Sequence, residues 1–249
     1  AAALSPDGTR IVSLADDQVA IWTVSHRGKG NGADPGPIEV SLTKTFDSSD
    51  GGIAVAAFRP DGQAVAMAAR DGTVRLRELS AGAEPVVYRG HESRVATVEF
   101  HPDGRALASS GHQPGVIKVW DTTGKPESVQ AVSFAVERRD IAAIGFTGDD
   151  RELLVLSMGG ILRRWEHATG GISERELTCT NAFLVPATPA AFSGDGKLMA
   201  AVAEMNRVRV METATGRTIT VFREHTVRVR FVACDRDCNR VVTFADGVK

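Results

Sequence analysis

Hydrophobic and polar residues alternate in short runs along most of the chain, and turn-forming residues separate these runs. VATVEF at 95–100 and ALASS at 106–110 flank the turn HPDG, and VIKVW at 116–120 follows a second turn. A period of two residues is that of a β-strand with one buried face, and no run shows a convincing helical period. The pattern therefore predicts an all-β chain built of hairpins.

The first of these turns occurs in six copies along the chain. Pro presets φ at a turn position, Asp accepts hydrogen bonds from nearby amides, and Gly takes a positive φ. Read from the last residue of the preceding strand, the copies are LSPDG at 4–8, FRPDG at 58–62, FHPDG at 100–104, FTGDD at 146–150, FSGDG at 192–196 and CDRDC at 234–238. Successive copies begin 54, 42, 46, 46 and 42 residues apart, which is the spacing of a structural repeat.

Two further strand patterns follow each of the first five hairpins, so one complete repeat carries four strands. Four antiparallel strands in such a repeat are typical of a propeller blade. We predict a single, incomplete β-propeller domain over residues 1–249, with about five complete four-stranded antiparallel blades and a partial sixth. The predicted blades are residues 1–47, 48–89, 90–134, 135–178, 179–223 and 224–249.

Charge and composition exclude several classes of partner. Lys and Arg total 29 against 31 Asp and Glu, so no global field attracts nucleic acid or an anionic membrane. The longest apolar runs are far shorter than the roughly 18 residues of a membrane span, and no signal sequence opens the chain. Three cysteines do not make a disulfide framework. We therefore expect a cytoplasmic protein without nucleic-acid binding or membrane insertion. Because the chain starts within a predicted strand, we also expect a fragment of a longer protein.

The repeat changes the meaning of the two closely spaced cysteines. Cys234 takes the place of the inward Phe or Leu of the other copies, and Cys238 takes the place of Gly. A left-handed conformation costs a non-glycine residue about 1–2 kcal/mol, so we predict that this turn changes type. A disulfide between the two thiols stays open as an alternative, as does a metal site with Asp235 and Asp237.

Other apparent chemical motifs are also explained by strands and turns. The segment SHRGKGNGADPGP at 25–37 places Lys29 between glycines and precedes no helix, so it is predicted to be a loop and not a phosphate-binding loop. The pair Asp149 and Asp150 lies in the fourth turn. No motif for nucleophilic, metal or cofactor chemistry remains, and we predict a non-catalytic protein without a cofactor.

The repeats resemble the WD-repeat family of β-propellers, of the WD-40 type. RGHESRVATVEFHPDGRALASSGHQPGVIKVWD at 89–121 is the best copy, with its Gly-His pair and its terminal Trp-Asp pair. The resemblance implies a structural hydrogen-bond network of His, Ser or Thr, Asp and Trp within a blade. The residues at these positions are His91, Ser109 and Trp120 in the third blade and His225, Thr243 and Asp246 in the sixth.

The resemblance also implies a protein-interaction platform or sensor module. Its partners would bind the face made by the loop before the first strand and the turn between the second and third strands. On this chain the candidate partner-binding residues are Arg70, Arg89, Glu92, His112, Arg138, Arg139, Glu204, Asn206, Arg223 and Glu224. The composition looks like that of bacterial members, which implies fusion to a kinase or a signalling NTPase domain. The alternatives are an enzyme with its active site in the propeller channel and a purely structural spacer.

Overall fold

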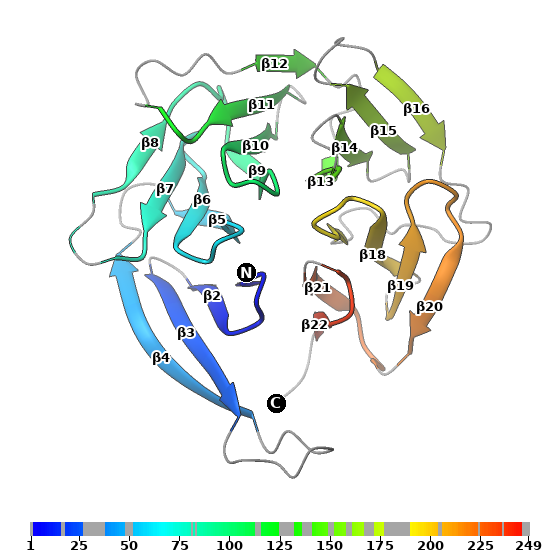
Figure 1. Ribbon diagram of the computed structural model, residues 1–249, viewed down its shortest axis with the longest axis horizontal. Coiled ribbons are helices and arrows are strands. Elements are labelled where there is room, and N and C mark those ends of the chain that lie inside the picture. Colours follow the sequence, from blue (N-terminus) through cyan, green and yellow to red (C-terminus); the bar gives the residue numbers. More distant parts are fainter. Residues whose placement is uncertain are drawn as a thin grey trace.

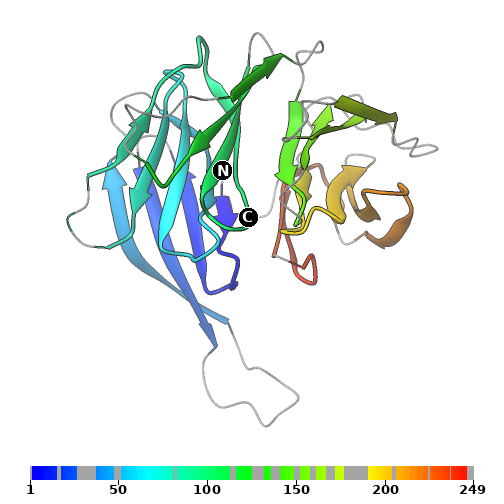
Figure 2. The same cartoon turned by 45° about the horizontal axis from the view of Figure 1, so that its top comes forward.

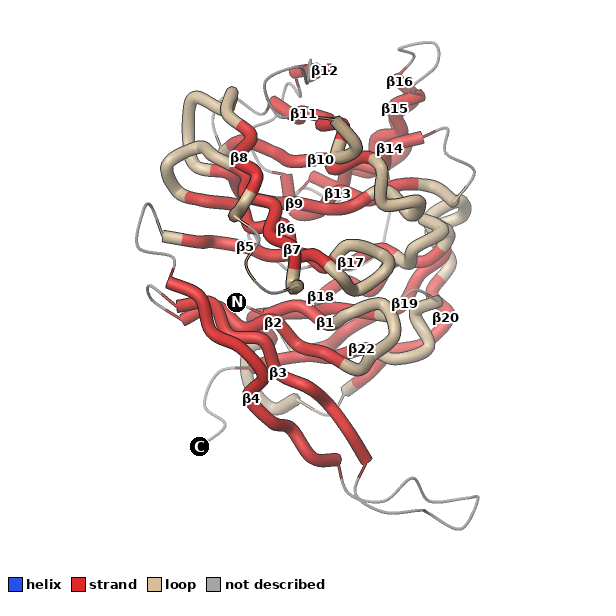
Figure 3. Tube along the Cα trace, turned by 60° about the vertical axis from the view of Figure 1, so that its left-hand side comes forward, coloured by secondary structure: helices blue, strands red, loops and turns tan. Residues whose placement is uncertain are grey.

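The strands of the computed structural model form six antiparallel sheets. The structure describes residues 2–15, 18–26, 38–47, 52–80, 82, 84–112, 116–124, 132–135, 141–148, 152–157, 161–166, 172–176, 190–203, 206–223, 225–235 and 237–245. Every regular element within these ranges is a β-strand (Figure 3). The predicted all-β class is confirmed.

The first three sheets contain four strands each, paired in chain order. The first sheet consists of β1 (Ala2–Leu4), β2 (Arg10–Ala15), β3 (Gln18–His26) and β4 (Ile38–Asp47). The second consists of β5 (Ile53–Phe58), β6 (Ala64–Ala69), β7 (Val74–Glu78) and β8 (Val86–Tyr88). The third consists of β9 (Val95–Phe100), β10 (Ala106–Gly111), β11 (Val116–Asp121) and β12 (Val132–Ala135).

Two further four-stranded sheets and a two-stranded sheet follow. The fourth sheet consists of β13 (Ile141–Phe146), β14 (Glu152–Ser157), β15 (Ile161–Glu166) and β16 (Ile172–Glu176). The fifth consists of β17 (Ala190–Phe192), β18 (Leu198–Ala203), β19 (Arg207–Glu212) and β20 (Thr218–Phe222). The sixth consists of β21 (Val229–Cys234) and β22 (Val241–Ala245).

The six sheets are arranged as blades around one axis, with their first strands innermost (Figure 1). Each first strand contacts the next one, and β21 contacts β1, so the inner ring is continuous. The predicted fold, a β-propeller of four-stranded antiparallel blades, is confirmed for five of the sheets.

The core lies between neighbouring blades. The buried side chains form five clusters, each of which joins two consecutive sheets. Trp120 lies in the cluster between the second and third sheets, and Trp165 in the one between the third and fourth. Their burial accords with the packing role that their common position at the end of the third strand predicts.

Blade one has an exposed apolar surface at its outer strand. Ile38, Val40 and Leu42 alternate along β4 and are 66%, 49% and 54% exposed. Leu42 lies opposite Trp22, which is partly exposed, unlike the two buried tryptophans. Trp22 occupies the position in β3 that Trp120 and Trp165 occupy in β11 and β15. The long β3–β4 hairpin extends beyond the ring (Figure 2).

The turns between first and second strands share one backbone geometry. In four of them a glycine with a positive φ of 67° to 75° donates its amide to a carbonyl three residues earlier. Cys238 makes the same bond to Asp235 at 3.0 Å, and its φ is 52°. The predicted change of turn type is therefore wrong. The sixth copy has the same turn as the others, and Cys238 adopts the left-handed conformation there. In the fourth copy, Asp149 and Asp150 lie outside the described residues.

None of the helices that a membrane crossing would need is found in the described part of the chain.

Cys238→Gly should stabilise the protein by roughly 0.5–1 kcal/mol in urea unfolding. The substitution removes the conformational cost of a non-glycine residue in the left-handed region. The greater conformational freedom of glycine in the unfolded chain offsets part of this gain in stability. Gly62→Ala is the matched opposite, because Gly62 has a φ of +69° and no atom would lie within 4 Å of an added Cβ. It should destabilise by about 1 kcal/mol. Equal stabilities for the two variants would contradict this account of the turn.

Candidate functional site

One end of the third blade is held by a buried three-residue network. The Trp120 indole donates to Ser109 Oγ at 2.7 Å, and Ser109 Oγ lies 2.7 Å from His91 Nε2. Indole nitrogen is a donor only, so Ser109 accepts from Trp120 and its own proton can be donated to a neutral His91. Ser109 is fully buried, and the His91 and Trp120 rings meet edge to face. The network fixes the loop before β9 to β10 and β11.

Burial, followed by the charge of Lys118, lowers the pKa of His91 to about 4. A low pKa keeps the ring neutral at physiological pH, which the Nε2 acceptor role requires. Gly111 leaves room for the imidazole ring of His91, because an added Cβ on Gly111 would lie 2.9 Å from His91 Nδ1.

The sixth sheet has a shorter version of this arrangement. His225 Nε2 lies 2.5 Å from Thr243 Oγ1, which joins the segment before β21 to β22. The Asn206 amide donates to the His225 carbonyl at 3.0 Å, so the fifth blade also contacts this segment. Asp246, the third predicted member, lies outside the described residues.

Neighbouring blades meet backbone to backbone on the same face. Asp71 accepts hydrogen bonds from the Thr73 amide and hydroxyl at 2.9 and 2.6 Å and shapes the turn between β6 and β7. At Gly72 in that turn, an added Cβ would lie 2.6 Å from the His91 carbonyl oxygen of the next blade. The loops of this face are therefore held tightly against one another.

The candidate partner-binding residues that the structure describes lie in these loops and turns. Arg70, Arg89, Glu92 and Arg223 are exposed, and His112 and Asn206 are partly exposed. The His112 ring lies 3.4 Å from the Arg94 guanidinium, a neighbour that the sequence did not single out. Arg138, Arg139, Glu204 and Glu224 lie outside the described residues. The face thus presents mixed charges on anchored loops.

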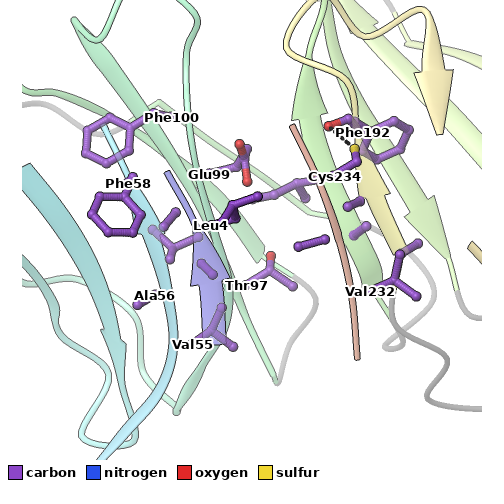
Figure 4. A pocket seen from close by; sticks show the side chains of 18 of the residues that line it. Leu4, Val55, Ala56, Phe58, Thr97, Glu99, Phe100, Phe192, Val232 and Cys234 are labelled. Atoms are coloured by element: carbon purple, nitrogen blue, oxygen red, sulfur yellow. Dashed lines mark hydrogen bonds between the residues drawn. The ribbon is translucent and has the colours of Figure 1, made fainter. Parts of the chain in front are cut away.

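The opposite end of the ring contains a cavity of about 620 Å³ on the axis. Residues from all six inner strands and from the adjoining turns line it, and most are Ala, Val or Phe (Figure 4). Glu99 of β9 interrupts this apolar lining, because its carboxyl group projects into the cavity and faces Cys234 of β21 across it. Sequence reasoning missed Glu99. Alignment of the repeats could have found it, because Glu99 is the only charged residue at the second-to-last position of a first strand. The other copies have small residues there, namely Ala3, Ala57, Gly145, Ala191 and Ala233.

Cys234, which lines this cavity, and Cys238 in the turn after β21 are free thiols. A hydrogen bond with Cys238, burial and the nearby charges of Glu99 and Asp235 raise the pKa of Cys234. The Cys234 thiol also lies 3.5 Å from the Phe192 carbonyl oxygen. A raised pKa disfavours the thiolate that nucleophilic or metal chemistry needs. No group of three or more metal-binding side chains occurs among the described residues.

Ser109→Ala should lower the free energy of unfolding by roughly 2–4 kcal/mol, because it leaves both Trp120 and His91 without their buried partner. Thr243→Ala is the matched variant in the sixth sheet. It removes one partly buried contact and should cost roughly 1–2 kcal/mol. Urea titration measures both values, and a cost for Thr243→Ala equal to or above that for Ser109→Ala would refute the ranking.

The contribution of His91 to stability should depend on pH. Its pKa is about 4 in the folded protein and 6.5 for a free side chain, so the unfolded chain takes up the proton first. Stability from this group is complete above about 6.5 and is lost as the pH falls toward 4. The difference in unfolding free energy between the wild type and His91→Gln should therefore shrink over that range. A constant difference would show that His91 does not titrate as described.

Comparison with known proteins supports the same architecture. The family model described as WD domain, G-beta repeat matches residues 40–77 and 83–121. Nuclear distribution protein nudF of Aspergillus niger is 23% identical over 224 residues, covering 89% of this chain and 48% of its own length. Transducin beta-like protein 3 of Rattus norvegicus is 31% identical over 138 residues, or 51% of this chain and 17% of that protein. A guanine nucleotide-binding protein subunit beta of Arabidopsis thaliana is 28% identical over 133 residues, or 51% and 35%.

The chain spans about half or less of the length of these relatives. All three come from eukaryotes, so a bacterial origin stays a prediction. The two matched repeats, these relatives and the ring of antiparallel blades together support membership of the chain in the WD40 repeat family.

Proposed function

We propose that the chain is a non-catalytic protein-interaction scaffold whose partner binds the face formed by the loops before the first strands and the turns between second and third strands. The observation that carries this proposal is the anchoring of the loop before β9 by the His91–Ser109–Trp120 network. Side chains on an anchored loop lose little freedom on binding, which favours recognition.

The charges and positions of the exposed side chains support this face as the partner-binding surface. Arg89 and Arg223 stand two residues before His91 and His225, so two blades present an arginine from equivalent positions. Glu92 adds the opposite charge close to Arg89. A partner with a complementary, largely acidic surface fits this pattern.

The relatives favour the same class of function. One is named as a subunit of a guanine nucleotide-binding protein, and a subunit is by definition part of an assembly. We extend only the general property, binding to another protein, to this chain. The identity of the partner, a cytoplasmic location and fusion to a kinase or NTPase domain stay predictions.

The axial cavity gives little support to the alternative of a channel enzyme. Such an enzyme needs several acid, base or nucleophilic groups that converge from different blades. Among the described residues deep in the cavity, Glu99 is accompanied by Thr97, whose hydroxyl is bonded to Ser110 at 2.8 Å, and by Cys234 with its raised pKa. This set does not form a nucleophile with its base.

Charge reversal on the proposed face should reduce partner binding. The immobilised protein would capture a partner from cell extract, and the captured protein would then be purified and titrated against Arg89→Glu and Arg223→Glu. Each reversal should weaken binding about tenfold or more through repulsion of an acidic partner. Arg105→Glu is the matched control, since Arg105 is exposed in a turn at the opposite end of the ring.

Two results would contradict the proposal. Undiminished binding by both reversals would show that this face is not the binding site. Failure of the wild type to retain any specific partner would favour the structural spacer. Circular dichroism of each variant establishes that the fold is intact.

A further inference from the structure

Glu99 has an unusual position for a carboxylate. It lies near the end of β9, on the axis, where the other five repeats carry Ala or Gly. Figure 4 shows the side chain directed into the cavity, between Leu4 and Cys234. Among the described residues no hydrogen bond or ion pair involves the Glu99 carboxylate. It is a carboxyl group aimed into a largely apolar space.

The cavity around it has the size and character of a ligand site. Its volume of about 620 Å³ lies within the range of small-molecule pockets. Val55, Phe58, Phe100 and Val232 contribute apolar walls, and the small residues at the axis keep the space open. The lining includes the first residues of the turns after the inner strands, such as Pro6 and Pro60, so the cavity lies toward that end of the ring. This is the end opposite to the proposed partner-binding face.

The charges at the cavity are mainly negative. Asp7 and Asp235 line it with Glu99, and Arg230 is the one basic residue among the lining residues that the structure describes. Asp7 and Asp235 accept hydrogen bonds within their own turns, from Ser5 and from the Arg240 amide. Glu99 has no such support. The local field therefore attracts a cation, and Glu99 is the carboxylate that would gain most from pairing.

The pKa of Glu99 also favours the binding of a cation. The Glu99 side chain is exposed to the cavity, which the six inner strands surround. Desolvation in this enclosed position raises the pKa of Glu99 to about 8. An uncompensated carboxylate in such surroundings is costly, and a bound cation would relieve that cost.

We propose that the axial cavity binds an organic cation, an ammonium group on a short apolar stem, with the ammonium paired to Glu99 and the stem packed among Val55, Phe58 and Val232. This inference goes beyond the proposed function, because it concerns the other end of the ring and a different ligand. The same chemistry is found in a free alkylamine and in the side chain of a lysine within a peptide.

Calorimetric titration of the purified protein with n-butylammonium tests the site. The measurement is made near pH 8, where an alkylammonium group stays charged. The wild type should bind, and Glu99→Gln should bind about tenfold or more weakly, because the amide keeps the shape but removes the charge. Glu39→Gln is the matched control, since Glu39 is exposed on β4 outside the cavity, and it should bind like the wild type. The uncharged analogue n-butanol should bind much more weakly than n-butylammonium.

A competition experiment with a peptide distinguishes the two sources of the ammonium group. An acetylated and amidated peptide with one lysine is added in competition with n-butylammonium. Competition would support the proposal with a protein as the source, and amine binding without competition would support it with a free amine. Equal binding by the wild type and Glu99→Gln, equal binding of n-butanol, or no binding by the wild type would each overturn the proposal. None of these results bears on the charge-reversal experiment at the opposite face.

Discussion

Six inner strands converge on one axis, and small side chains next to that axis make this arrangement possible. Gly145 shows how strict the constraint is. An added Cβ on this residue would lie 2.7 to 2.8 Å from the ring and Cβ of Phe192 in the next blade. Alanine at the equivalent positions of four other strands leaves the central space open. Glu99 breaks the rule, and it can do so only because its neighbours across the axis are small. The cavity and its carboxylate are thus two results of one packing constraint.

Stability in this ring comes from contacts between neighbours. Each of the five buried clusters joins two consecutive sheets, so a blade is held by the blade before it and the blade after it. The contact between the sixth sheet and the first differs, since among the described residues it involves mainly the inner strands and turns. There β21 contacts β1, and an added Cβ on Gly8 would lie 3.3 Å from the Arg240 guanidinium.

The sequence allowed the fold to be predicted well and the candidate site only in part. Alternating hydrophobicity and six related turns were sufficient for strands and blades, because both reflect local geometry. The positive φ of Cys238 was not predicted, because the local penalty of about 1–2 kcal/mol was weighed without the strand pairing that holds the turn. Glu99 was missed for a different reason. An alternating strand pattern assigns a charged residue to solvent, and only the closed ring turns that outward-facing position into the wall of a cavity.

The backbone contacts between blades on the proposed binding face affect how modular this chain can be. The turn at Gly72 belongs to one repeat and presses on the carbonyl of His91 in the next, and Asn206 bonds across the fifth and sixth sheets in a similar way. Each of these surface elements is therefore built from the turn between the second and third strands of one repeat and the loop before the first strand of the next. Exchange of a single repeat for another would alter two such junctions at once. The natural unit for transplanting a recognition surface in this protein is the junction between repeats, not the repeat itself.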